Sequence, residues 1–380
     1  MGVRIRVPRL VRRTWAGGLV ALLVGALVVS AVAVPGYSVA DLRLHDGTIF
    51  AVKQDRALLG MVNTSIKDLA TATRVPDGNL DVLQEGRTIV VRSRSSNQIQ
   101  SFDPATGRMG SVVSLPAAGD LALNAGKIAV ISRTNGAVWF GDAAQMLARD
   151  FNKEKALLDL GENALVTVTS DGHLIGLSLT TSELVRLSGS TPVRTPVPLQ
   201  LDAKVADVEL SAVGDQAVVL DRTKQSIWFE GLDQAITMPM GSKAHLASPI
   251  PESPLMDGQL RALVATPRGL VGVAPKQVLS LSGPMPEGVV QRPVAVGPCA
   301  YAVVGSRLAT VCADQQPTIQ EIPDLPAGAE AVPRVNRNTV ILNDSVTGII
   351  WLVNDGMRKI TDWERVSPAD TTTKQTDPND

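Results

Sequence analysis

The stretch GRTIVVRSRSSNQIQSFDPATGR, residues 86–108, decides the fold. It consists of an apolar run, a polar turn, a second apolar run and an Asp-Pro-x-Thr-Gly turn. Short runs of Val, Ile, Ala and Leu between turn residues are typical of buried β-strands. Its Asp103 is either a site of chemistry or a turn former, and the rest of the chain distinguishes the two.

The same pattern recurs along the chain. Eight copies start at Asp46, Gly86, Gly126, Asn163, Gly214, Arg268, Gly305 and Arg337. Their mean spacing is about 41 residues, in the range where four short strands make one propeller blade. We therefore expect an all-β propeller of seven or eight blades over residues 39–365, with a sandwich or a β-helix as the alternative. The first unit can lend a strand to the last to close the ring, and DAAQMLARDF, residues 142–151, predicts one short helix at most.

Asp103 loses its special status in this comparison, because Gly, Ser, Glu or Asn takes its position in the other copies. Aspartate commonly starts a turn, since its side chain caps nearby backbone N–H groups. Three further acids follow the same rule at strand ends: Asp171, Asp221 and Asp344. We interpret all four as turn formers, with convergence in a funnel as the alternative.

The N-terminus predicts export. Residues 1–14 form a basic tail with five arginines and no acid, and residues 15–34 are twenty residues without a charge. Such a segment spans a bilayer as one transmembrane helix, with the basic tail in the cytoplasm. The alternative is a cleaved signal ending at Ala31-Val32-Ala33. Either one places the rest of the chain outside the cytoplasm, at the cell membrane or secreted. Residues 366–380 are too polar to pack and are expected to be a disordered tail or linker, which suggests that further domains follow.

The two cysteines, Cys299 and Cys312, flank a hairpin with Gly305-Ser306 at its turn. Counting outward from this turn places them opposite each other at a non-hydrogen-bonded position, where Cα atoms are about 4.5 Å apart. This distance and an oxidising compartment favour a cross-strand disulfide. Two free buried thiols are the alternative.

Catalytic, cofactor and metal motifs are not found. The three histidines, His45, His173 and His245, lie in or near turns and loops without a second ligand, and no nucleophile elbow or phosphate loop is present. Without the N-terminal arginines, 31 basic residues face 37 acidic ones, which gives no basic stripe for nucleic acid. Tryptophan recurs at one position of three copies and is expected to pack between blades, with an aromatic cage as the alternative: Trp139, Trp228 and Trp351.

The Phe-Asp-Pro-x-Thr-Gly turn and the Trp-bearing strands resemble the repeats of bacterial YVTN, NHL and quinoprotein-type propellers. The quinoprotein repeat has its tryptophan after the Thr-Gly turn, whereas here it precedes a turn, so no cofactor is carried over. The order of basic tail, anchor, propeller and polar linker resembles exported actinobacterial proteins in which Ig-like or fibronectin type III domains follow.

We expect a membrane-anchored, non-catalytic module that binds a protein or cell-wall partner. The alternatives are a propeller enzyme of hydrolase or lactonase type, with its site in the central funnel, and an envelope-assembly scaffold.

Overall fold

The computed structural model describes residues 47–188, 191–199, 201, 207–239, 241, 243–251, 261–366 and 368–369. The predicted basic tail, the predicted anchor or signal segment and His45 lie outside these residues. Within the described part, no helix has the length and apolar character needed to cross a membrane.

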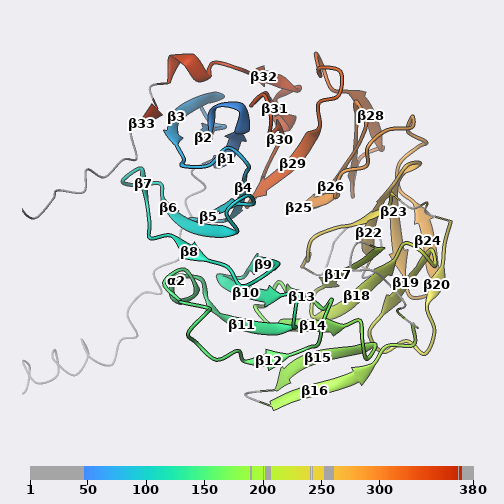
Figure 1. The fold of residues 1–380 in the computed structure, drawn as a ribbon. Coiled ribbons are helices and arrows are strands. Elements are labelled where there is room, and N and C mark those ends of the chain that lie inside the picture. The colour runs from blue at the N-terminus through green and yellow to red at the C-terminus, as the bar shows by residue number, and fades with distance from the viewer. Residues whose placement is uncertain are drawn as a thin grey trace, which may run out of the picture. The chain divides into compact units, whose positions relative to one another are not determined.

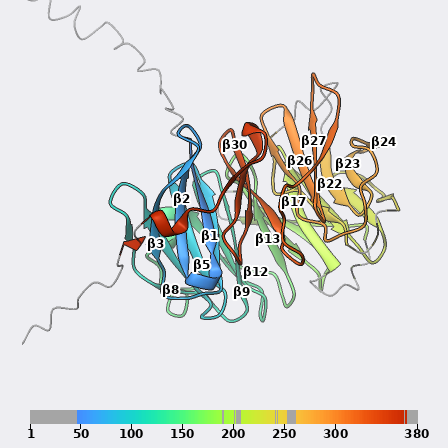
Figure 2. The same ribbon diagram turned by 90° about the horizontal axis from the view of Figure 1, so that it is seen from above.

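Eight sheets follow one another around a ring, so the chain is an eight-bladed β-propeller (Figure 1). Turned by 90°, the strands run side by side across the thickness of the ring (Figure 2). The all-β prediction is thus confirmed, and the number of blades is eight.

The blades are numbered along the chain. Blade 1 comprises β1 (Thr48–Lys53), β2 (Leu58–Asn63) and β3 (Asp68–Arg74), and blade 2 comprises β4 (Leu80–Glu85), β5 (Thr88–Ser93), β6 (Gln98–Asp103), β7 (Arg108–Met109) and β8 (Val113–Ser114). Blade 3 comprises β9 (Gly119–Asn124), β10 (Lys127–Ser132), β11 (Ala137–Asp142) and β12 (Leu158–Asp159). Blade 4 comprises β13 (Leu165–Val168), β14 (Leu174–Ser178), β15 (Glu183–Ser188) and β16 (Thr191–Pro196).

Blades 5 to 8 continue this order. Blade 5 comprises β17 (Val208–Val213), β18 (Gln216–Asp221), β19 (Ser226–Phe229) and β20 (Ile236–Thr237), and blade 6 comprises β21 (His245–Leu246), β22 (Ala262–Thr266), β23 (Gly269–Ala274) and β24 (Gln277–Ser280). Blade 7 comprises β25 (Val294–Val296), β26 (Cys299–Val304), β27 (Arg307–Cys312) and β28 (Thr318–Glu321). Blade 8 comprises β29 (Ala331–Asn336), β30 (Thr339–Asp344), β31 (Ile350–Leu352) and β32 (Arg358–Ile360). The remaining elements are α2 (Ala143–Met146), η1 (Gln54–Arg56), η3 (Val353–Asp355), η4 (Trp363–Arg365) and β33 (Pro368–Ala369).

Buried strands explain the near-continuous apolar runs of the sequence. All six residues of β30 are buried, because both faces of its sheet pack against neighbouring blades. The three recurring tryptophans are buried in three different clusters, and each indole N–H donates to a backbone carbonyl oxygen. They therefore pack between blades, as predicted, and form no common cage.

The copies seen in the sequence do not all start at the same strand. Those at residues 86, 126, 214 and 337 precede the second strand of their blades, whereas the copy at 163 precedes the first strand of blade 4. The copies at 268 and 305 precede the third strands of blades 6 and 7. The slip arises because strands at different blade positions share the same apolar composition.

The C-terminal segment closes the ring. β33 pairs in parallel with β3, so the last strand joins the first blade (Figure 1). Among the described residues, all four strands of blade 8 come from its own segment and none from the first unit. Next to it, Trp363 is buried and its Nε1 donates to the carbonyl oxygen of Gly348 at 2.7 Å. A Cβ atom on Gly60 would lie 2.6 Å from the Trp363 ring, so this position in β2 requires glycine.

The inner edge of β1 is held by side chains. Among the described strands, none pairs with this edge, and β29 contacts β4 directly although blade 1 lies between their blades. The N–H of Phe50 donates to Gln84 Oε1 and the N–H of Val52 donates to Asn343 Oδ1, both at 2.9 Å. Asn336 Nδ2 donates to the carbonyl oxygen of Thr48 at 2.7 Å. Three amides from blades 2 and 8 thus replace a backbone partner.

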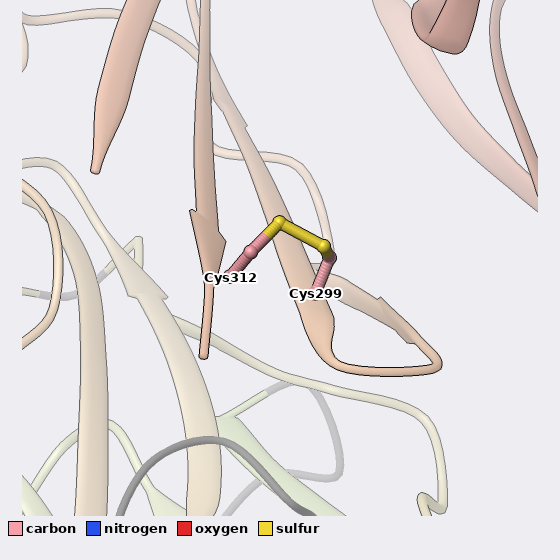
Figure 3. Close-up of a disulfide and its surroundings, with 2 residues drawn as sticks. All are labelled: Cys299 and Cys312. Atoms are coloured by element: carbon pink, nitrogen blue, oxygen red, sulfur yellow. A yellow bond between two sulfur atoms is a disulfide. The ribbon is translucent and has the colours of Figure 1, made fainter. Parts of the chain in front are cut away.

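A disulfide joins Cys299 to Cys312 across β26 and β27 (Figure 3). The Cα atoms are 4.0 Å apart, and Val304 lies opposite Arg307, as counted from the turn. The next pair outward is hydrogen-bonded, since the N–H of Ala313 donates to the carbonyl oxygen of Pro298. The cysteines therefore occupy a non-hydrogen-bonded position, and the predicted bridge is confirmed.

Candidate functional site

Two faces of the ring organise the candidate sites. In blades 2 to 8, the innermost strands begin and the second strands end at one face, which we call the entry face; the opposite one is the exit face. In these blades the turns between first and second strands lie at the exit face. In blade 1 the turn between β1 and β2 lies at the entry face, because the N–H of Gln54 donates to the carbonyl oxygen of Ser345.

The central channel holds a cavity of ≈ 340 Å³, lined by β1, β4, β9, β25, β29 and residues 248–250. Half of its lining residues are Val, Leu, Ile or Pro, and the others include Arg334 and Arg337. Glu85 is the only carboxylate among the lining residues, and it accepts the N–H of Gly126 at 2.7 Å. No histidine lines this cavity.

The four acids singled out in the sequence are not brought together. Asp103 and Asp171 lie at the exit face, whereas Asp221 and Asp344 end second strands at the entry face of blades 5 and 8. Asp103 caps its own turn, since Oδ1 accepts the N–H of Ala105 and Oδ2 accepts the hydroxyl of Thr106. These two hydrogen bonds hold the pKa of Asp103 below its ordinary value, the one from Thr106 contributing most.

Asp221 and Asp344 cap turns in the same manner. The interpretation as turn formers is therefore supported by contacts for Asp103, Asp221 and Asp344, and for Asp171 it stays a prediction.

Histidine contributes one feature that sequence reasoning missed. His173 is exposed in its turn and contacts Asp215, as a surface residue. His245 begins β21 at the entry face, and its Nδ1 lies 2.7 Å from Oε1 of the buried Glu209. In the described part of the chain, no three His, Cys, Asp or Glu side chains gather as a metal site would require.

Three acid–arginine groups surround the entry face. An acid at the second position of an innermost strand pairs with an arginine thirteen residues later, just after the adjacent strand. The pairs are Asp81 with Arg94, Asp120 with Arg133, and Glu209 with Arg222. The constant spacing follows from the hairpin register and is a signal in the sequence, but each acid precedes the turn residue at which its copy of the repeat begins.

Each of these acids also receives a second arginine. Arg334 reaches Asp81 from blade 8, Arg92 reaches Asp120 from blade 2, and Arg292 reaches Glu209 from the segment before blade 7. The contacts of Arg334 and Arg292 join parts of the ring that do not follow each other in the chain. The contact of Arg92 joins blades 2 and 3, which one loop connects. Each acid with its two arginines carries one net positive charge.

Asp81 and Glu209 are held ionised. Burial alone would raise the pKa of Asp81, but the charge of Arg334 and the hydrogen bond from Arg94 outweigh it and lower the pKa. Burial would likewise raise the pKa of Glu209, and the hydrogen bond from His245 and the charge of Arg292 lower it.

The entry pocket lies beside the first acid–arginine group. It has a volume of ≈ 540 Å³. One wall comes from blade 2, with Leu80, Asp81 and Arg94, and the other comes from blade 8 and the segment before it, residues 326–334 and 344–347. Gln54 of blade 1 completes the lining, because its Nε2 donates to the carbonyl oxygen of Leu80.

A larger hollow of ≈ 820 Å³ lies at the rim between blades 2 and 3, lined by α2 and residues 111–114. Three of its lining residues are charged: Arg149 and Asp150 pair with Glu154 and Lys153 in their own loop, and Arg87 is exposed on blade 2. The entry pocket is the stronger candidate, since it collects side chains from three blades at the channel.

Solved bacterial β-propellers are similar to this chain. The dihydro-heme d1 dehydrogenase NirN, in complex with DHE, matches with a TM-score of 0.57 and 14% identity over 83% of this chain and 72% of that one. AztD from Citrobacter koseri matches with a TM-score of 0.51 and 14% identity over 82% of this chain and 92% of that one. At such identities the likeness shows the fold alone. No family and no curated protein matches the sequence.

Proposed function

We propose that this chain is a non-catalytic binding propeller outside the cytoplasm, attached to the membrane through residues 15–34, and that it holds a protein or cell-wall partner at its entry face. The entry pocket carries this proposal. It is a preformed hollow, within the size range of ligand sites, between walls that several blades hold in place.

The protonation of the acids supports binding over catalysis. A general base at neutral pH works best with a pKa near 7. The pKa values of Asp81 and Glu209 lie below their ordinary values, because arginine or histidine partners stabilise the charged form. Fixed charges of this kind position a ligand but exchange no proton near neutrality.

The disulfide supports export, because such bonds persist in oxidising compartments and are rare in the cytoplasm. Together with the predicted anchor, it favours a chain retained at the outer side of the membrane. Labelling of free thiols in cells that are lysed under denaturing conditions, with and without reductant, tests this point. We expect Cys299 and Cys312 to label only after reduction, and free thiols in freshly lysed cells would contradict export.

Crosslinking in intact bacterial envelopes tests the binding role. The full-length chain is compared with Val346→Asp, which places a charge on the wall of the entry pocket, and with Val193→Asp on the exposed strand β16. We expect Val346→Asp to lose a discrete crosslinked species that Val193→Asp retains. Equal crosslinking by both variants would place the partner elsewhere on the ring.

A further inference from the structure

Most polar groups of the entry pocket are already bonded within the protein. Arg334 donates to Asn343, Asp81, Val82 and Ser345, so all three of its guanidinium nitrogens are engaged within the protein. The carboxylate of Asp344 accepts two hydrogen bonds from its own turn, and Gln54 is bound to Leu80. These groups shape the pocket and are not available to a ligand.

Two charged side chains remain available, one on each wall. Arg94 belongs to blade 2, and its side chain is 52% exposed. Its Nη2 donates to Asp81, which is the one hydrogen bond of this side chain among the described residues. Glu330 lies at the start of blade 8 and is exposed, and among the described residues its one contact is the amide of Gln291 with Oε2. The pocket thus presents a cation on one wall and an anion on the other.

Apolar side chains also line the entry pocket. Leu80 and Val332 line the pocket, and Val346 is 57% exposed although it is a large apolar residue. An exposed valine inside a concave site loses water contact when a ligand covers it, which favours binding of a small apolar group.

We propose that the entry pocket binds a short peptide through its free termini, with its carboxylate at Arg94, its ammonium group at Glu330 and small side chains against Val346. The proposal rests on the binding role of the entry face. Arginine binds carboxylates through charge-assisted hydrogen bonds, and a carboxylate does the same for an ammonium group. A volume of ≈ 540 Å³ accommodates such a ligand and leaves room for water.

Calorimetric titration of the full-length chain in detergent with Ala-Ala-Ala tests this inference. Its N-acetyl and C-amide forms each remove one terminal charge. We expect each capped form to bind roughly fivefold more weakly, as for a charge pair that stays partly in water. Absence of binding by Ala-Ala-Ala at millimolar concentration, or equal binding of all three peptides, would overturn the inference.

Variants assign the two ends. Arg94→Gln should abolish the difference between the free and amidated peptides, and Glu330→Gln the difference between the free and acetylated ones. Arg133→Gln is the matched control for the first, because it holds the same position in blade 3 outside the pocket. Glu162→Gln, before the first strand of blade 4, is the control for the second.

Arg94→Gln is expected to fold, since Asp81 retains Arg334. If the controls alter the preference for free termini as much as the pocket variants do, the site is not this pocket. If no peptide binds while Val346→Asp still removes the envelope crosslink, the entry face binds a partner of another class, and only the peptide inference fails.

Discussion

Blade 7 and blade 1 are stabilised in opposite ways. The four strands of blade 7 lie within residues 294–321, and its disulfide joins two of them over a separation of 13 residues. Blade 1 depends on Asn336, Asn343, Trp363 and β33, which lie almost a whole chain length away. Similar sheets in one ring are thus secured either by a local covalent bond or by distant non-covalent contacts.

Removing the Trp363 side chain should have the largest effect. It is buried against blade 1 and its indole N–H is bonded, so Trp363→Ala should cost about 3–5 kcal/mol of unfolding free energy. Chemical denaturation measures the loss. Hydrogen exchange should rise in β1 to β3, whereas Trp228→Ala should raise it in blades 4 and 5. The same exchange pattern for both variants would show that blade 1 is not specially dependent on the C-terminal segment.

Loss of the disulfide should come next. By restricting the unfolded chain, a disulfide that closes a loop as long as that between Cys299 and Cys312 adds roughly 3 kcal/mol to the free energy of unfolding. The double variant Cys299→Ala/Cys312→Ala should therefore lose about that amount in chemical denaturation without reductant. Addition of reductant should bring the wild type to the same value. A wild type unaffected by reduction would mean that the local bond contributes little to blade 7.

Breaking the amide contacts of blade 1 should cost less. Asn343→Leu leaves the N–H of Val52 buried without its acceptor, and an unsatisfied group of this kind costs about 1–3 kcal/mol. Thermal and chemical denaturation measure it. Gln100→Leu, which removes an exposed amide contact in blade 2, is the control and should change stability little. Equal effects would indicate that β1 does not depend on these amides.

The smallest of these effects is expected from acidification, which should weaken the contact between blades 5 and 7. Because the pKa of Glu209 is lowered in the folded state, its contribution is complete above its ordinary value of about 4.3 and is lost as the pH falls through the folded value. The free energy of unfolding, measured from pH 7 to pH 3, should decline below about pH 5. Glu209→Gln should be less stable at pH 7 and decline less steeply. Parallel curves would exclude this role for Glu209.

The sequence predicted what depends on local pattern. Turn residues before Val-rich runs indicated the strands, and the Gly305 turn determined the register that joins Cys299 to Cys312. Capping by Asp103 also follows from its neighbours in the sequence.

The entry pocket was not predicted, because its walls come from blades 2 and 8 and nothing in either segment indicates the other. Closure by β33 was missed for a different reason, because residues 366–380 have too few apolar side chains to indicate a strand.

The contact between Val52 and Asn343 spans 291 residues, and this separation has a consequence for the order of synthesis. Blade 1 is translated first, but of its three amide partners only Gln84 of blade 2 follows soon, and the inner edge stays incomplete until Asn336 and Asn343 have left the ribosome. Trp363 and β33 arrive later still. The first blade made is therefore among the last to be completed, and its exposed strand edges must be kept from pairing with other chains throughout translation.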